Sequence, residues 1–245
     1  MTRSRSISLL ACLALFAPAQ AFAESAAEHQ DVTEHCGPKR AATAVIVIHG
    51  GGFLSGTPTK TASICAGLGR DGLAVTNLDY PVRDFAGTYQ AVKAAAAEAG
   101  RHSRMVFSYG ESAGGGLSAL AAARGWVDGA FAWAPVSDIA AWRESRQLAG
   151  HSWAPYLRAS DWTDITRLSA ASWAGPTSAP IMVLHGRDDG IVPIAQSIAL
   201  KKLWPAMTLK KYNGGHWPNS KVHSAAIACF RGHTPCKWAR SAQTK

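Results

Sequence analysis

Ser112 is the residue of this sequence best placed to act as a nucleophile. It stands in the segment YGESAGGG at residues 109–116, where four glycines and an alanine surround one serine. The segment fits the pattern G-x-S-x-G and lies between an apolar run that predicts a strand and an alanine-rich run that predicts a helix. A tight turn between this strand and this helix leaves no room for larger side chains beside the serine. The strain of such a turn leaves the serine hydroxyl exposed above a sheet.

A serine hydroxyl is a poor nucleophile unless a base takes its proton. We expect His216 to be that base, because it follows the last predicted strand within the glycine loop GGHW. His49 and His185 each end a predicted strand in an HG turn, which favours structural hydrogen bonds to the backbone. The other six of the nine histidines lie in terminal segments, loops and an insertion.

A carboxylate must hold the imidazole in the right tautomer and stabilise its charged form. The segment HGRDDGIVP at residues 185–193 offers two carboxylates directly after a predicted strand. We expect Asp189 to be the partner of the histidine, with Asp188 as the alternative. The order serine, aspartate, histidine, with each residue after a predicted strand, is typical of serine hydrolases with a mostly parallel sheet.

The segment HGGGF at residues 49–53 follows the first predicted strand and offers backbone N–H groups that no Cβ shields. Together with the amide of Ala113, these groups would stabilise the oxyanion of an acyl-transfer reaction. A glycine-rich loop also suits phosphate, but the sequence has neither GK[ST] nor GxGxxG, which disfavours a nucleotide site.

The elements that position these residues follow from an alternation of short apolar runs with alanine-rich runs. This alternation predicts an α/β fold with a doubly wound, mostly parallel sheet of about six strands and helices on both faces. The predicted strands are 44–49, 73–78, 104–108, 129–133, 181–185 and 208–212. The predicted helices are 60–70, 88–99 with Thr88 as the N-cap, 113–124, 194–203 and 221–230.

Residues 137–178 interrupt this alternation without a clear strand. The segment carries four tryptophans, namely Trp142, Trp153, Trp162 and Trp173. A loop of this length without secondary structure is unusual in a compact domain, so we expect a helical insertion that covers a site. Because aromatic faces bind apolar and carbohydrate surfaces well, we expect Phe53, Trp142 and Trp217 to contact the substrate.

The first 23 residues have the features of a secretory signal peptide. They begin with Arg3 and Arg5, continue with an apolar run too short to span a bilayer, and end in the small-x-small pattern AFA. We expect cleavage after Ala23 and a secreted or periplasmic protein whose residues 24–245 form one domain. No later segment is long and apolar enough to span a membrane.

Four cysteines remain after such cleavage, and in an oxidising compartment they predict two disulfides with three possible pairings. We expect Cys36–Cys65 and Cys229–Cys236. A zinc site is the alternative, but the spacing is irregular and contains no CxxC.

The formal net charge of the whole chain is +9. Its lysines and arginines are scattered, with Lys201-Lys202 and Lys210-Lys211 as the densest pairs, which favours a solvated basic surface over a nucleic-acid site. The expected partner is instead an ester substrate, either a small molecule or one carried on a polysaccharide, and we expect no metal or organic cofactor.

Four motifs in this order, HGGGF, GESAG, HGRDDGIVP and GGHW, resemble the α/β-hydrolase superfamily. The similarity extends over about residues 44–230 and is greatest to the HGGG-bearing esterases and lipases related to hormone-sensitive lipase. The resemblance implies that Gly51, Gly52 and Ala113 supply the oxyanion donors and that the aspartate is Asp189. It also implies a Ser-His-Asp esterase that acts through an acyl-enzyme, with an amidase or peptidase, or a catalytically silent binding module, as alternatives.

The sequence departs from this family in two places. Only about 20 residues separate the signal from the first predicted strand, so we expect the leading antiparallel strands and most of an N-terminal cap to be reduced or missing. The family's usual continuation after Asp79-Tyr80 is also altered, to PVRD at residues 81–84. Both departures concern the substrate rather than the chemistry.

Overall fold

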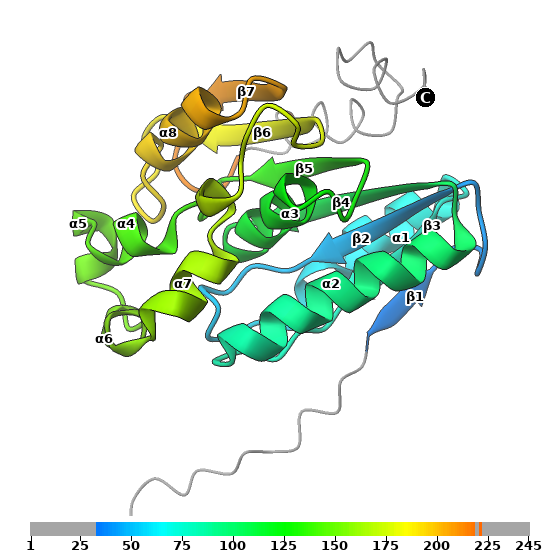
Figure 1. Ribbon diagram of the computed structural model, residues 1–245, viewed down its shortest axis with the longest axis horizontal. Coiled ribbons are helices and arrows are strands. Elements are labelled where there is room, and N and C mark those ends of the chain that lie inside the picture. Colours follow the sequence, from blue (N-terminus) through cyan, green and yellow to red (C-terminus); the bar gives the residue numbers. More distant parts are fainter. Residues whose placement is uncertain (1–32, 219–220, 222–245) are drawn as a thin grey trace, which may run out of the picture. The chain divides into compact units, whose positions relative to one another are not determined.

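A mostly parallel sheet forms the centre of the protein, as a computed structural model that describes residues 33–218 and 221 shows (Figure 1). Its strands lie in the order β1-β3-β2-β4-β5-β6-β7. Of these, β1 alone runs antiparallel to its neighbour, and the other pairs are parallel. The strands are β1 (Glu34–Cys36), β2 (Thr43–Ile48), β3 (Ala74–Leu78), β4 (Met105–Glu111), β5 (Gly129–Trp133), β6 (Ile181–Gly186) and β7 (Met207–Tyr212).

Helices connect the parallel strands and fill the insertion. The α-helices are α1 (Ala62–Arg70), α2 (Phe85–His102), α3 (Ala113–Ala123), α4 (Ile139–Arg143), α5 (Arg146–Ala149), α6 (Ala154–Ala159), α7 (Trp162–Leu168) and α8 (Ala195–Leu203). Two short 3₁₀ helices, η1 (Pro58–Thr61) and η2 (Ala170–Ser172), complete the set in the described part of the chain.

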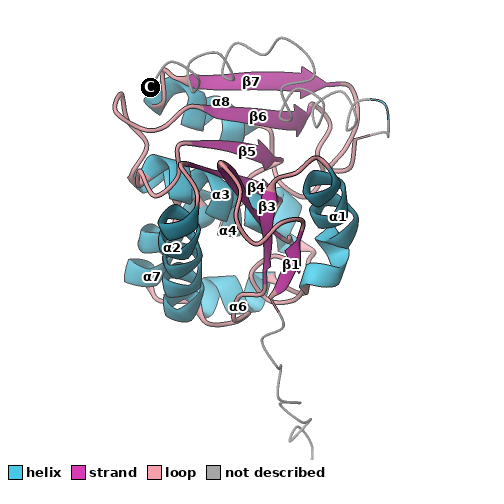
Figure 2. Ribbon diagram, turned by 90° about the vertical axis from the view of Figure 1, so that its right-hand side faces the viewer, coloured by secondary structure: helices cyan, strands magenta, loops and turns pink. Residues whose placement is uncertain are grey.

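Both faces of the sheet are covered, and Figure 2 shows α2 and α1 on opposite sides of it. Side chains alternate along β2, so that Ile46 and Ile48 join a core with α2, α3 and α8, whereas Val45 and Val47 join a second core with α1. Truncating a fully buried residue such as Ile46 to alanine typically costs about 2 to 5 kcal/mol. The α/β class and the doubly wound sheet predicted from the sequence are therefore confirmed.

All six predicted strands are present within a few residues of their expected ends. The seventh strand, β1, was not predicted, and it pairs with β3 through Glu34 opposite Asn77 and Cys36 opposite Val75. It is a leading antiparallel strand of only three residues, in agreement with the expectation that such strands are reduced.

The start of α2 corrects the predicted N-cap. The helix begins at Phe85 because the side chain of Asp84 accepts a hydrogen bond from the Gly87 amide at 2.8 Å. Thr88 lies one turn further along, where its hydroxyl donates to the Pro81 carbonyl at 2.7 Å. The helix also continues through Gly100 to His102.

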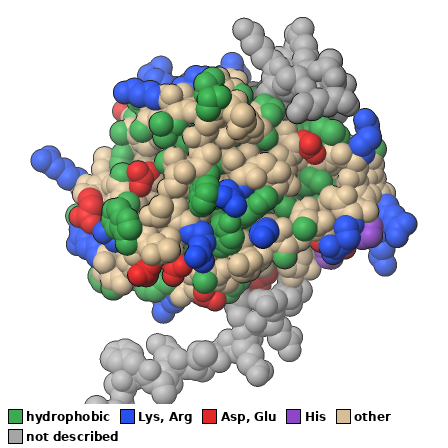
Figure 3. Space-filling view, viewed as in Figure 1, with side chains coloured by type: hydrophobic (Ala, Val, Ile, Leu, Met, Phe, Trp, Pro, Cys, Tyr) green, Lys and Arg blue, Asp and Glu red, His purple; other side chains and the backbone are tan. Residues whose placement is uncertain are grey.

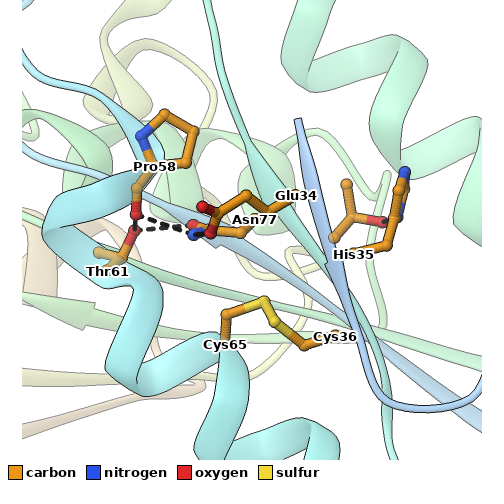
Figure 4. The surroundings of a disulfide bond; sticks show 8 residues. Glu34, His35, Cys36, Pro58, Thr61, Cys65 and Asn77 are labelled. Carbon is orange, nitrogen blue, oxygen red and sulfur yellow. Dashed lines mark hydrogen bonds between the residues drawn. A yellow bond between two sulfur atoms is a disulfide. The ribbon is translucent and has the colours of Figure 1, made fainter. Parts of the chain in front are cut away.

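A disulfide joins Cys36 of β1 to Cys65 of α1 and confirms the first predicted pairing (Figure 4). Beside it, Asn77 donates to the Glu34 carboxylate and to the Pro58 carbonyl, and it accepts a hydrogen bond from Thr61. These bonds hold the edge strand against the 3₁₀ helix that precedes α1. The second predicted pair, Cys229–Cys236, lies outside the described residues, as do the segment 1–23 and all of the predicted helix 221–230 except Lys221.

The segment 137–178 is helical, as expected, and contains α4 to α7 and η2. None of the helices in residues 33–218 and 221 is long and apolar enough to cross a bilayer. On the face shown in Figure 3, basic side chains are spread among acidic and apolar ones rather than gathered in one patch.

Candidate active site

Ser112 occupies a strained turn between β4 and α3. Its backbone angles, φ 56° and ψ −118°, lie in a region that residues other than glycine rarely adopt. The Ser112 amide donates to the Trp133 carbonyl at 2.8 Å, and its carbonyl accepts from Gly116 and Val136. The end of β5, the loop that follows it and the first turn of α3 therefore hold this turn, in which Ser112 is buried.

Two glycines make this turn possible because backbone approaches them closely. A Cβ on Gly110 would lie 2.0 Å from the Gly114 carbonyl oxygen, and one on Gly114 would lie 2.2 Å from the Ile48 carbonyl oxygen. Such contacts leave no room for a side chain. The glycines thus bring the start of α3 against the end of β2 and the loop that follows it.

Asp189 and His216 form a buried pair on the loops after β6 and β7. Nδ1 of His216 lies 2.7 Å from Oδ2 of Asp189, while Oδ1 accepts from the amides of Ile191 and Val192 at 2.8 Å each. Burial opposes ionisation of Asp189, but the hydrogen bonds from two histidines and the Ile191 amide outweigh it and hold its pKa well below the usual range. An ionised Asp189 accepts the proton of Nδ1, so Nε2 of His216 is the nitrogen free to act as a base.

The loop that carries His216 is fixed to two strands. The indole of Trp133 donates to the His216 carbonyl at 2.9 Å, and the hydroxyl of Tyr212 lies 2.8 Å from the Gly215 carbonyl and 3.2 Å from that of His216. Trp217 packs edge-on against the His216 ring at a centroid distance of 4.8 Å. The imidazole is therefore positioned by its backbone as well as by Asp189.

The glycine-rich loop lies directly beside the serine. A Cβ on Gly50 would come within 3.2 Å of the Cβ of Ser112. His49 supports the loop, since its ring stacks on Tyr80 at 4.3 Å and the Tyr80 hydroxyl donates to the His49 carbonyl at 3.0 Å. His49 thus has the structural role expected of it.

The expected oxyanion donors lie around this junction. Gly51 and Gly52 adopt positive φ values of 134° and 65°, and the Gly51 carbonyl is bound by the amides of Leu54 and Ser55. Ala113 is the first residue of α3, where helical amides have no partner within the helix. Within residues 33–218, the amides of Gly51, Gly52 and Ala113 donate no hydrogen bond.

A pocket of about 380 Å³ opens at this junction. Its lining residues are Gly50, Gly51, Lys60, Glu111, Ser112, Trp153, Ile191, His216 and Trp217. Ser112 and His216, which are distant in the sequence, therefore line the same pocket. A second cavity of about 330 Å³ lies beside the disulfide and contains neither residue.

The family profile described as "alpha/beta hydrolase fold" matches residues 136–220. Esterase 2 of Thermogutta terrifontis, solved phosphonylated by sarin, is 18% identical over 82% of this chain and 93% of its own, with a TM-score of 0.68. The chain has the α/β-hydrolase fold.

Two further solved structures share this hydrolase fold. An esterase/lipase from an uncultured bacterium is 17% identical over 86% of each chain, with a TM-score of 0.67. The acetyl ester-xyloside bifunctional hydrolase of Caldicellulosiruptor lactoaceticus is 17% identical over 82% of this chain and 86% of its own, with a TM-score of 0.65. A comparison with curated protein sequences finds no match.

Within the hydrolase fold, Ser112, Asp189 and His216 follow the carboxyl ends of β4, β6 and β7, which are the positions expected from the sequence. Asp188, the alternative carboxylate, is exposed, and its amide donates to the Gly214 carbonyl. Nδ1 of His216 donates its hydrogen bond to Asp189 instead. In the described residues, no group of three or more histidine, cysteine or acidic side chains could hold a metal ion.

Two of the three expected substrate contacts do not line the pocket. Trp142 is fully buried, and its indole donates to the Ile191 carbonyl at 2.9 Å. Phe53 is also buried and packs edge-on against Phe85. Both belong to the core beneath the site, which corrects the expectation. Trp217, the third, is 61% exposed and does line the pocket.

Trp153 is the tryptophan of the insertion that reaches the pocket. Its ring covers Gly52, so that a Cβ on that glycine would lie 2.6 Å from the indole. The neighbouring His151 stacks on the same indole at 5.1 Å. The sequence places both Trp153 and Trp142 in the insertion, and it contains no signal that shows which of the two lines the pocket.

Glu111 also lines the pocket and was not among the expected site residues, although it directly precedes Ser112. Its carboxylate accepts a hydrogen bond from the Tyr109 hydroxyl at 2.7 Å. Burial raises the pKa of Glu111, while the Tyr109 hydrogen bond and the charge of His216 act in the opposite direction. Lys60 and Ile191 were missed as well, because only the folded chain brings them to the pocket.

Proposed function

We propose that the protein is a serine hydrolase that cleaves carboxylic esters with Ser112, His216 and Asp189, as an HGGG-type enzyme similar to hormone-sensitive lipase. The observation that carries the proposal is the 2.7 Å bond between Asp189 and His216, a histidine that lines the same pocket as Ser112. The strained turn at Ser112 and the available amides of the glycine loop support the same chemistry.

In the first half of the reaction, the Ser112 hydroxyl attacks the acyl carbonyl while its proton passes to Nε2 of His216. The resulting oxyanion is stabilised by the amides of Gly51, Gly52 and Ala113. The tetrahedral intermediate then collapses, the bond to the alcohol breaks, and His216 gives its proton to the leaving alkoxide. The acyl group remains on Ser112 as an ester.

In the second half, water replaces the alcohol. His216 takes a proton from the water, the hydroxyl attacks the acyl-enzyme, and the carboxylic acid leaves as Ser112 regains its proton. Asp189 remains ionised throughout and stabilises the imidazolium of both halves, in agreement with the low pKa of its carboxyl.

The pocket favours a small ester with an apolar or ring-shaped part. Its volume of about 380 Å³ lies at the low end of ligand sites, and two indoles and Ile191 supply apolar surface. A structural neighbour at 17% identity is described as an acetyl ester-xyloside bifunctional hydrolase, and another at 19% was solved with butyrate bound. We therefore place short-chain acyl esters, including acetylated sugars, first among candidate substrates.

A fluorophosphonate probe together with an ester panel tests the proposal. We expect the probe to label the wild-type protein at Ser112 and the variant Ser112→Ala not to be labelled. Acetyl to palmitoyl p-nitrophenyl esters, acetylated xylan and feruloyl sugars would then establish the acyl preference. An absence of labelling in well-folded protein would contradict the proposal of a serine hydrolase and favour a catalytically silent binding module.

The same three residues would also suit an amidase or peptidase. Matched p-nitroanilides separate the two activities, because an esterase releases nitrophenol from the ester but leaves the anilide intact. Cleavage of the anilides at a comparable rate would move the assignment to amide hydrolysis.

We also propose that the protein is exported and cleaved after Ala23. The Cys36–Cys65 disulfide supports an oxidising compartment. Amino-terminal sequencing of protein recovered from the periplasm or medium should begin at Glu24, and full-length protein confined to the cytoplasm would contradict export.

A further inference from the structure

We infer that His185 is a positioning residue that fixes the carboxylate of Asp189 for its bond to His216. The inference rests on the proposed function and extends it by one residue. His185 ends β6, is fully buried and lies outside the residues that line the pocket. It reaches the chemistry only through Asp189.

The contacts of His185 define its protonation. Its Nε2 lies 2.9 Å from the Val192 carbonyl oxygen and 3.3 Å from Oδ2 of Asp189, and both of these are acceptors. Nε2 therefore carries a hydrogen, which it donates to the Val192 carbonyl with Oδ2 of Asp189 close beside it. Nδ1 lies 2.7 Å from the hydroxyl of Ser197, which can donate to it. The neutral tautomer protonated on Nε2 satisfies every one of these contacts.

N–H groups from four residues surround the carboxylate of Asp189. An ionised carboxylate offers about four lone-pair directions. Oδ1 accepts from the amides of Ile191 and Val192, and Oδ2 accepts from His216 and lies 3.3 Å from Nε2 of His185. Because the side chain of Asp189 is buried, water does not readily replace a missing donor. Loss of His185 would remove the N–H group beside Oδ2 and with it a support that holds this oxygen toward His216.

The proposed role differs from simple packing in what it predicts for kcat and KM. A misoriented carboxylate affects the transition state, in which His216 is charged, but not the binding of a neutral ester. A misplacement of about 1 Å in a positioned group costs on the order of 100-fold in rate. We expect a loss in kcat of about 10- to 100-fold with KM unchanged.

Two variants of similar size separate the functions of the two ring nitrogens. In His185→Gln the amide N–H reaches the position of Nε2 and can donate to Asp189. In His185→Asn the shorter amide reaches only the position of Nδ1 and can bond to Ser197. We expect Gln to retain most of kcat and Asn to lose about 10- to 100-fold. Ser197→Ala is the stability control, since it removes a buried hydrogen bond but leaves the donor to Asp189 and should preserve kcat.

The decisive comparison uses folded protein, verified by circular dichroism, with p-nitrophenyl acetate at saturating concentration. Equal losses in the Gln and Asn variants, or wild-type kcat in Asn, would overturn the inference. Nitrogen-15 NMR of the wild-type protein provides a test that needs no variant. Protonation of His185 on Nε2 supports the assignment, whereas protonation on Nδ1 alone contradicts it. If the wild-type protein hydrolyses no ester and is not labelled by the fluorophosphonate probe, the proposed function fails. The NMR result still decides which nitrogen of His185 is protonated.

Discussion

Nδ1 of His216 lies 2.7 Å from Oδ2 of Asp189, whereas the adjacent Asp188 is exposed to solvent. Replacing Asp189 by Asn should therefore lower kcat by about 10⁴-fold, because an amide favours the wrong tautomer of the histidine. Asp188→Asn is the matched control and should retain wild-type kcat. Steady-state kinetics with p-nitrophenyl acetate would measure kcat for both variants. A large loss of kcat in Asp188→Asn but not in Asp189→Asn would contradict the assignment of Asp189 as the partner of His216.

The pH dependence of stability should also reflect Asp189. Its pKa is lower in the folded protein than in the unfolded chain, so ionisation of Asp189 stabilises the fold fully above about pH 4. This contribution is lost as the pH falls toward the folded pKa. Urea unfolding between pH 3 and pH 7 should show a weaker pH dependence for Asp189→Asn than for the wild type. Identical slopes in the acid range would contradict the depressed pKa.

Gly114, the second residue of α3, should not tolerate a side chain. A Cβ on Gly114 would lie 2.2 Å from one backbone oxygen and 2.4 Å from another. We expect Gly114→Ala to lower the free energy of unfolding by at least about 1 to 3 kcal/mol and to abolish probe labelling. Gly100→Ala, in α2 with no atom within 4 Å of the new carbon, should be neutral or stabilising by about 0.4 to 1 kcal/mol. Thermal unfolding of both proteins provides the comparison.

Trp217 should influence which esters are preferred. It is 61% exposed, lines the pocket and contacts His216. Trp217→Ala should reduce kcat/KM for esters with an aromatic or sugar ring by about 2- to 10-fold more than for a small aliphatic ester. Trp162→Ala removes a tryptophan of equal exposure that packs with Arg143 instead of lining the pocket. A uniform effect of Trp217→Ala on all esters would exclude a role in selectivity.

The Cys36–Cys65 disulfide should contribute to stability. It links residues 29 positions apart and joins an edge strand of three residues to α1. The double variant Cys36→Ser/Cys65→Ser should lose about 2 to 4 kcal/mol of unfolding free energy with unchanged kcat. An unchanged urea midpoint would show that the edge strand is held by its hydrogen bonds alone.

The sheet could be predicted from the sequence because its parallel strands are covered on both faces and form continuous apolar runs. The short strand β1 has no such run, and it exists because Cys36 is bonded to α1 and its backbone pairs with β3. The start of α2 was placed too late because Thr88 and Asp84 are both good capping residues. Only the folded turn decides which of them faces the free amides.

In the candidate site, too, residues that stand in local motifs could be predicted, whereas residues placed only by packing could not. Ser112, Asp189 and His216 each stand in a local motif, so their positions could be predicted, while their catalytic roles stay a prediction. Trp142 and Trp153 belong to one insertion and differ only in which of them packs inward. No local pattern records that choice, and none indicates that His185 contacts Asp189 across a turn.

The indole of Trp153 rests on Gly52, so the insertion is in contact with the loop that supplies the proposed oxyanion donors. Exchanging the insertion for that of another enzyme would therefore remove a support of the catalytic backbone together with a pocket wall. Efforts to redesign substrate range in this protein should keep residues 151–153 and vary the helices around them.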